Sequence, residues 1–231
     1  MEKINPKDFI EIEFTGKVKD GEIFDSNIKE GLEKLHSGHN HEIKAKPFIF
    51  SVGENMFLKS IDDFLIGKQT GKDYEIELEP EKAFGERNPQ LIKVIPLRIF
   101  KQQQTPPHPG MLFNFDGQIG KIISVSGGRI ITDFNNPLAG KIVTYKLNVK
   151  RKVTDINEKA KAIIEFFTKK EFPFEIKDEK LIIQAEKQFS QFFNLFKDKF
   201  KELLGLDVEV VDKIEKEEVK EEKKDNKKEI K

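Results

Sequence analysis

The chain of 231 residues contains no cysteine. This absence excludes disulfides, thiolate nucleophiles and cysteine-based zinc sites, so a metal could be bound only through histidine and carboxylate side chains. Three of the four histidines, His36, His39 and His41, lie in the segment HSGHNH, a spacing that would permit zinc, nickel or copper. The surrounding Ser, Gly and Asn predict a polar loop instead, in which three ligands would lose entropy on chelation. We therefore expect no metal site, with these histidines as weak candidate ligands.

Net charge is also lacking, because 41 Lys and Arg residues balance 41 Asp and Glu residues. Without an excess of either sign, the chain has no electrostatic reason to bind nucleic acid or an anionic membrane. The N-terminal sequence MEKINPKDF lacks the basic and apolar regions of a signal peptide, and no apolar run approaches the ~20 residues of a membrane helix. We expect a cytoplasmic protein with no nucleic-acid and no membrane partner.

Tryptophan is absent and tyrosine occurs twice, against 21 phenylalanines, so most of the aromatic surface carries no hydroxyl group. Charged residues make up 35% of the chain, and most of them are Lys and Glu. This composition is typical of thermophile proteins, although an AT-rich genome would also favour Lys, Ile and Phe.

The first part of the chain predicts a small antiparallel sheet with one helix packed on it. Apolar and polar residues alternate over residues 9–19, and Asp20-Gly21 is a turn signal that leads into a second strand. Apolar residues at helical spacing over residues 56–66 predict a helix that ends at Gly67. The other elements expected here are a strand at 22–27, a short helix at 28–35 and strands at 46–53 and 73–80.

The middle of the chain predicts a small, mostly β module at residues 87–134. Pro106, Pro107 and Pro109 forbid regular pairing, and the short strands that follow are joined by glycine-containing turns. A long strand at 140–153 has no obvious partner inside this module. We therefore expect that strand to return to the first sheet, which would make the module an insertion.

The last part predicts an α/β domain at residues 154–212. Its second helix carries a long apolar stripe made of Phe189, Phe192, Phe193, Phe196, Phe200, Leu203 and Leu204. A unit of this size could bury part of so wide a stripe against a second copy, so we expect a homodimer through this domain. The tail at 213–231 has almost no apolar residues and is expected to be solvated.

The usual catalytic constellations are missing. There is no Gly-x-Ser-x-Gly motif, and the segment GQIGK lacks the spacing of a phosphate-binding loop. Asp62 and Asp63 lie in the expected helix, where adjacent positions do not share a face. We interpret them as solvated helix carboxylates, not as an acid–base pair.

Four segments, in order, resemble the FKBP-type peptidyl-prolyl cis-trans isomerases: FTG, IFDSN, PFIFSVGENMFLKSIDDFLIGKQTGKDYEIELEPEKAFG and NNPLAGKIVTYKLNV. The insertion between AFGERNP and NNPLAGK resembles that of the SlyD-like subgroup, and the resemblance covers residues 7–153. It implies an α+β fold, with an FKBP-like antiparallel half-barrel sheet, one helix and an inserted small β domain, here followed by a C-terminal α/β domain. The expected domains are an isomerase domain at 1–86 plus 135–153, the inserted chaperone module at 87–134, the C-terminal domain at 154–212 and the charged tail at 213–231.

The resemblance also implies a proline-binding pocket. Carried over residue by residue, its lining would be Phe14, Phe24, Asp25, Phe48, Phe57, Leu58, Ile61, Phe84 and Tyr145. The backbone N–H of Leu58 would donate to a substrate carbonyl, and Ile61 stands where many family members have Trp. Phe14 and Phe84 stand where related proteins often have Tyr, so Asp25 loses one hydroxyl partner.

The activity implied is rotation of X-Pro bonds in unfolded polypeptide clients, which needs no cofactor. The inserted module and the C-terminal domain would hold these clients, and a module as small as the inserted one can only partly bury its apolar surface. Its client-binding residues would be Met111, Leu112, Phe113, Ile122 and Ile123. The alternative is a holdase chaperone with a weak or vestigial isomerase pocket, and a metal-regulated chaperone would rest on the histidines alone.

Overall fold

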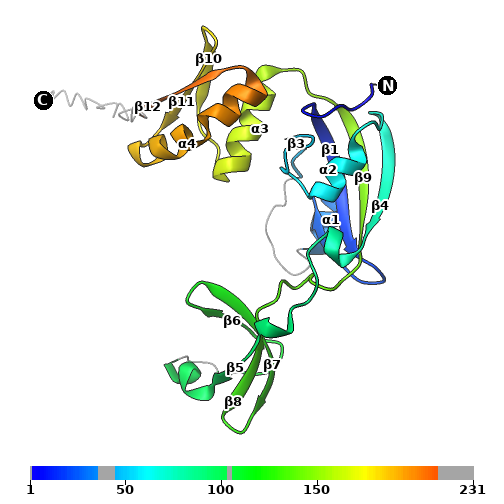
Figure 1. Ribbon diagram of the computed structural model, residues 1–231, viewed down its shortest axis with the longest axis vertical. Coiled ribbons are helices and arrows are strands. Elements are labelled where there is room, and N and C mark those ends of the chain that lie inside the picture. Colours follow the sequence, from blue (N-terminus) through cyan, green and yellow to red (C-terminus); the bar gives the residue numbers. More distant parts are fainter. Residues whose placement is uncertain (1, 36–44, 103–105, 213–231) are drawn as a thin grey trace, which may run out of the picture. The chain divides into compact units, whose positions relative to one another are not determined.

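The computed structural model describes residues 2–35, 45–102 and 106–212. The chain separates into two compact units, Met1–Thr154 and Asp155–Lys231 (Figure 1). The histidine segment HSGHNH and the charged tail lie outside the described residues. Within the described residues, no helix has the length and apolar character needed to cross a membrane.

The first unit contains a five-stranded antiparallel sheet in the order β2-β1-β9-β4, with β3 also paired to β1. Its strands are β1 (Phe9–Val18), β2 (Ile23–Ser26), β3 (Phe48–Ser51), β4 (Lys72–Leu78) and β9 (Val143–Lys152). Strand β9 follows the inserted module in the chain and pairs with both β1 and β4. The prediction that this strand returns to the first sheet is confirmed.

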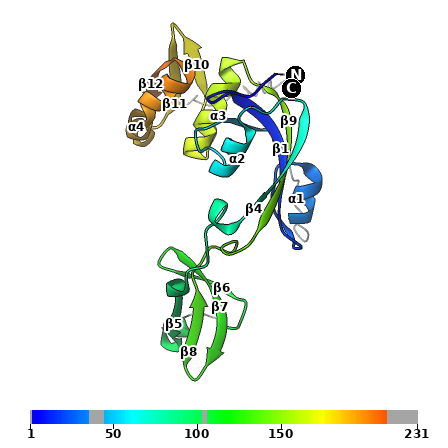
Figure 2. The ribbon, with the colours of Figure 1, turned by 45° about the vertical axis from the view of Figure 1, so that its right-hand side comes forward.

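Alternation along the central strands gives this sheet one apolar and one charged face. Ile12 is fully buried, whereas its neighbour Glu13 forms an ion pair with Lys150 of β9 at 2.6 Å on the other face. Helix α2 (Lys59–Leu65) lies against the sheet in both ribbon views and buries Ile61 completely (Figures 1 and 2). The predicted pocket residues would therefore lie between this helix and the apolar face.

The short helix α1 (Lys29–Leu35) packs closely on the edge strand β2. A Cβ atom at Gly31 would lie 2.1 Å from the Ser26 hydroxyl oxygen, so only glycine permits this approach. Ser26 in turn donates a hydrogen bond to the carbonyl of Phe14 at 3.0 Å. The helix thereby supports β2, the strand that contains Asp25.

The inserted module has its own four-stranded antiparallel sheet, in the order β5-β8-β7-β6. Its strands are β5 (Ile92–Pro96), β6 (Leu112–Phe115), β7 (Gln118–Ser126) and β8 (Arg129–Asp133). Phe100, in the 3₁₀ helix η3 (Leu97–Gln102), forms the core with Ile122 and Ile130. A core of three buried residues is small, so much apolar surface stays exposed.

The second unit combines two helices with a three-stranded sheet in the order β10-β11-β12, in which β11 and β12 are parallel. The elements are α3 (Ile156–Thr168), β10 (Phe174–Lys177), β11 (Lys180–Ala185), α4 (Lys187–Leu204) and β12 (Asp207–Asp212). Asp155 caps α3 by accepting a hydrogen bond from the Glu158 N–H, and Gly205 ends α4 in the left-handed conformation. Together with the first unit, this confirms the predicted α+β class.

The apolar stripe of α4 is divided by this packing. Phe193 and Phe200 are fully buried inside the unit, and Phe196 stacks on Phe167 of α3 with ring centroids 4.5 Å apart. Leu195, outside the predicted stripe, is 79% exposed. Part of the stripe is thus core of a single copy.

Candidate active site

The candidate site is organised around Gly16 in β1. In the sheet register Gly16 lies opposite Asp25 of β2 on one side and Tyr145 of β9 on the other. A Cβ atom at this position would lie 2.9 Å from both the Phe24 ring and the Tyr145 ring. Because glycine has no side chain, the Phe24 ring of β2 and the Tyr145 ring of β9 can both close over the strand at this position.

The aromatic residues form one connected set of rings. Phe57 contacts Phe14, Phe48 and Tyr145 with centroids 4.9, 5.3 and 5.6 Å apart. Phe24 joins the set through an edge-to-face contact with Tyr145 at 5.6 Å. Such contacts stabilise aromatic pairs beyond the area they bury, so each ring restricts the orientation of its neighbours.

Burial divides the predicted pocket residues into a base and a wall. Phe14, Ile61 and Tyr145 are at most 8% exposed and form the base. The half-buried residues that form the wall are Phe24, Asp25, Phe48, Phe57, Leu58 and Phe84. The ring contacts bring together side chains from β1, β2, β3 and β9 with Phe57 of the segment before α2, and Phe84 reaches the group through its ring contact with Phe24 at 5.5 Å.

Asp25 is the ionisable group of the wall. Burial raises the pKa of its carboxyl group above the ordinary value, while a hydrogen bond from the Ser26 N–H opposes this effect. Burial, together with the nearby charge of Asp25, raises the pKa of the Tyr145 phenol as well. The Asp25 carboxyl group and the Tyr145 hydroxyl thus lie beside the same group of rings, and burial disfavours the charged form of both.

The residue whose amide is the predicted donor to substrate, Leu58, lies at the start of helix α2. Leu58 is the cap residue before α2, with φ −63° and ψ 129°, so its N–H has no acceptor within the helix. Ser60, in the first turn of the helix, donates to the carbonyl of Lys82 at 2.7 Å. That bond ties the segment before Phe84 to the same end of α2.

Sequence reasoning missed Asn27, which fixes the strand under the pocket. Its side-chain oxygen accepts a hydrogen bond from the Phe14 N–H at 2.6 Å, and its side-chain nitrogen donates to the Ile12 carbonyl at 2.8 Å. The side chain completes the hydrogen bonding of β1 beyond the end of β2. No periodic signal marks such a residue, because its role depends on the adjacent strand.

The interpretation of Asp62 as a solvated carboxylate is wrong. Asp62 is 1% exposed, and burial raises the pKa of its carboxyl group to about 6, although hydrogen bonds from the Asn55 and Gly53 amides oppose the shift. One oxygen accepts from the Asn55 N–H at 3.0 Å, and the other has no partner among the described residues. Asp62 lies three positions before the buried Leu65, a helical spacing that already placed it on the inner face. It holds the turn that leads to Phe57.

Comparison with known proteins identifies the family. Residues 1–97 match the model of the FKBP-type peptidyl-prolyl cis-trans isomerase, and residues 93–138 match the model described as FKBP26, IF domain. The short-type peptidyl-prolyl cis-trans isomerase of Methanocaldococcus jannaschii is 30% identical over 147 residues, which cover 64% of this chain and 92% of the relative. This chain belongs to the FKBP-type peptidyl-prolyl cis-trans isomerases.

Two further proteins are similar to this isomerase. The FKBP-type peptidyl-prolyl cis-trans isomerase SlyD of Vibrio cholerae is 29% identical over 137 residues, covering 57% of this chain and 60% of the relative. A solved structure of three FKBP domains of wheat FKBP73 covers 67% of this chain and 42% of its own, at 17% identity and a TM-score of 0.34. The predicted family, with its inserted domain and SlyD relatives, is confirmed.

In the inserted module of this isomerase, the five predicted client-binding residues differ in their exposure to solvent. Leu112 is 62% exposed and Ile123 is 42% exposed, whereas Met111 and Phe113 pack partly against the core. Ile122 is fully buried in that core, so its side chain is not available to a client, and its assignment was wrong. The structure adds other exposed apolar residues to the same module: Val94, Ile119, Val125 and Ile131.

No group of three or more metal-binding side chains occurs in the described parts of this isomerase. The candidate ligands of the HSGHNH segment lie outside those parts. The metal hypothesis therefore stays a prediction from the sequence.

Proposed function

We propose that this isomerase acts on X-Pro bonds in unfolded or nascent polypeptides, with the pocket residues predicted above as its site. The observation that carries the proposal is the connected set of rings beside the half-buried Asp25. Rotating a prolyl bond breaks no covalent bond but must cross a barrier of ~18–20 kcal/mol that arises from amide resonance. A site for this reaction needs shape and polarity, and it needs no nucleophile.

The geometry suits the twisted amide better than the planar one. Twisting removes the resonance and the charge separation that water stabilises, so an apolar aromatic enclosure disfavours the planar ground state relative to the transition state. The Asp25 carboxylate repels a carbonyl oxygen, and the Leu58 N–H attracts one. These two groups would orient the substrate so that its carbonyl points to the start of α2.

A matched pair of variants tests this site. Phe48→Leu removes one ring of the wall, and we expect kcat/KM for a short prolyl peptide to fall about tenfold, or about 1.4 kcal/mol of transition-state stabilisation. Phe64→Leu is the control, because Phe64 is an equally half-buried ring that packs on Tyr74 instead. If Phe48→Leu and Asp25→Ala both leave the peptide rate unchanged, the pocket assignment is wrong.

We assign the holding of clients to the inserted module, residues 87–134. Val94 and Ile131 lie opposite each other on adjacent strands and are 59% and 38% exposed, so they form a continuous apolar patch. With Leu112 and Ile119 at 62% and 65%, the module exposes more apolar surface than its small core can bury. Apolar segments of an unfolded chain are the partners that fit such a surface.

Substitutions in the full chain test the holding role. The double variant Leu112→Ser/Ile119→Ser should weaken binding of a permanently unfolded protein and slow its proline-limited refolding, while the prolyl-peptide rate stays unchanged. Ile66→Ser, at an exposed apolar position after α2, is the control. Unchanged client binding in the double variant would contradict the role.

For the second unit we propose a homodimer interface on the exposed part of α4. Leu195 is 79% exposed, and Phe192 and Phe196 beside it are half-buried. Leu195→Glu should convert a dimer to a monomer in light scattering, and Asn194→Glu is the control on the same helix. A wild-type monomer at micromolar concentration would remove the proposal.

A further inference from the structure

Two short segments join the inserted module to the isomerase domain. The outgoing segment runs from Gly85 to the 3₁₀ helix η2 (Pro89–Leu91), and the returning segment runs from the end of β8 to Gly140. At the isomerase side the Gly140 N–H donates to the Gly85 carbonyl at 2.9 Å. The module-side end of this neck is closed by side chains.

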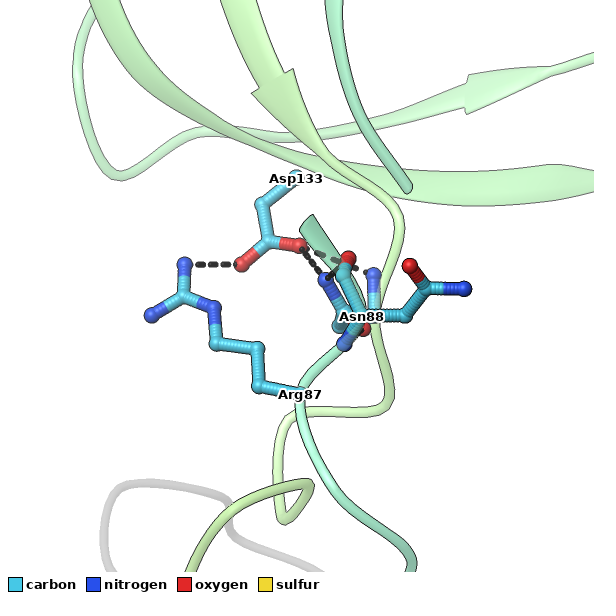
Figure 3. A network of polar contacts seen from close by, with 4 residues as sticks. Arg87, Asn88 and Asp133 are labelled. Atoms are coloured by element: carbon cyan, nitrogen blue, oxygen red, sulfur yellow. Dashed lines mark hydrogen bonds and ion pairs between the residues drawn. The ribbon is translucent and has the colours of Figure 1, made fainter. Parts of the chain in front are cut away.

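Asp133, the last residue of β8, is the centre of these contacts (Figure 3). One of its oxygens accepts two hydrogen bonds from Asn135, at 2.9 Å from the backbone N–H and 2.7 Å from the side-chain amide. Its other oxygen accepts from the Arg87 guanidinium group of the outgoing segment. The carboxylate therefore joins the two segments of the neck.

Asn88 and Asn135 add a reciprocal pair of bonds between the segments. The Asn88 N–H donates to the Asn135 side-chain oxygen at 2.8 Å, and the Asn135 side-chain nitrogen donates to the Asn88 carbonyl at 3.0 Å. The Asn88 side chain also caps η2 by accepting from the Gln90 N–H at 2.9 Å. The bonds thus continue into the first turn of the module.

The surroundings favour the ionised form of Asp133. Its side chain is 15% exposed, and burial alone would raise the pKa of the carboxyl group, but the bonds from Asn135 and the charge of Arg87 hold that pKa below its ordinary value. The Arg87 side chain is 52% exposed. Removing Arg87 therefore takes away one partner of a mostly buried charge without opening a cavity.

We propose that Arg87, Asn88, Asp133 and Asn135 form a neck clasp that positions the inserted module for transfer of a held client to the pocket. The inference rests on the holding role proposed above. A second binding site raises the rate at a first one through effective concentration, which is highest when the link between them has the right span and stiffness. Two unjoined segments would let the module move over a wider volume and lower that concentration.

Arg87→Gln is the variant that tests the clasp, and Lys150→Gln is its control. Lys150 is an exposed cation in an ion pair with Glu13, on the charged face of the isomerase sheet. For Arg87→Gln we expect kcat/KM for proline-limited refolding of an unfolded protein to fall about three- to tenfold. The prolyl-peptide rate and the Kd for a permanently unfolded protein should stay unchanged, and Arg87→Lys should recover part of the loss.

The outcomes separate this inference from the proposed function. If Leu112→Ser/Ile119→Ser slows protein refolding but Arg87→Gln does not, the module holds clients and the clasp has no positioning role. A weaker Kd for the unfolded protein in Arg87→Gln would make the clasp a structural support of the module and overturn the inference. If the double variant leaves refolding intact, the proposed holding role is wrong, and so is the clasp inference that rests on it.

Discussion

The isomerase domain and the inserted module both contain clusters of phenylalanine, but they place them differently. In the isomerase domain the wall rings Phe24, Phe48 and Phe57 are half-buried members of the connected set of rings. In the module, rings such as Phe100 and Phe113, with centroids 4.6 Å apart, pack against each other in the core. The apolar residues that the module exposes are aliphatic, as Leu112 and Ile119 illustrate.

This difference matches two kinds of recognition. Rings that orient one another make a preorganised enclosure suited to one chemical group, here the proline ring and its amide. Exposed aliphatic side chains keep several rotamers and can adapt to many sequences, as promiscuous binding surfaces do. The aromatic site would select the bond, and the aliphatic surface would accept the chain that carries it.

Substitutions at Gly16 and Gly120 should produce the largest difference in behaviour between the isomerase domain and the inserted module. A Cβ atom at Gly16 would lie 2.9 Å from two pocket rings, and one at Gly120 would lie 2.5 Å from Thr132 inside the module. Each alanine variant should lose about 1–3 kcal/mol of local stability through overpacking. Gly16→Ala should lower the prolyl-peptide rate and spare client binding, and Gly120→Ala should do the reverse. Equal losses of both activities in either variant would contradict the separation.

Asn27→Ala should affect the isomerase domain and leave the inserted module unchanged. The substitution leaves the Phe14 N–H and the Ile12 carbonyl without their partner, at a cost of about 1–3 kcal/mol in the free energy of unfolding. Peptide isomerisation should slow, while the Kd for an unfolded protein stays the same. Asn148→Ala, which removes a side-chain bond to Asp73 on the charged face, is the control for urea unfolding and peptide kinetics.

The buried carboxylate of Asp62 predicts a pH dependence confined to the isomerase domain. Its folded-state pKa of about 6 lies above the ordinary value of 3.8, so folding favours the protonated form. The contribution to stability is fully present below about pH 4 and is lost as the pH rises through about 6, an effect of at most about 3 kcal/mol.

Asp62→Asn removes this dependence. The amide oxygen can still accept from the Asn55 N–H, so the variant should be more stable than wild type at pH 8 and similar at pH 4, with a small change in peptide rate. Asp63→Asn, at the exposed neighbouring position, is the control in urea unfolding from pH 4 to 8. A parallel pH profile for wild type and Asp62→Asn would contradict the assignment.

Much of the fold followed from local patterns. Period-two alternation marked β1 and β4, and the spacing of Ile61 and Leu65 marked α2. Prediction was poorer where an outcome depended on a distant segment. Ile122 and Ile123 have the same chemistry, yet one is buried and the other exposed, because successive residues of β7 face opposite sides of the sheet and the side of Ile122 packs on Phe100. Which of the two faces is covered depends on Phe100, a partner that the pair itself does not reveal.

The order of motifs determined the family and the insertion and predicted the set of pocket residues, because each motif carries its own backbone and side-chain pattern. The tertiary structure decided which of these residues are buried and which are half-buried, that Asp62 is buried, and that Arg87 meets Asp133 across 46 positions. These outcomes depend on contacts between segments far apart in the chain, where packing and desolvation outweigh local preference.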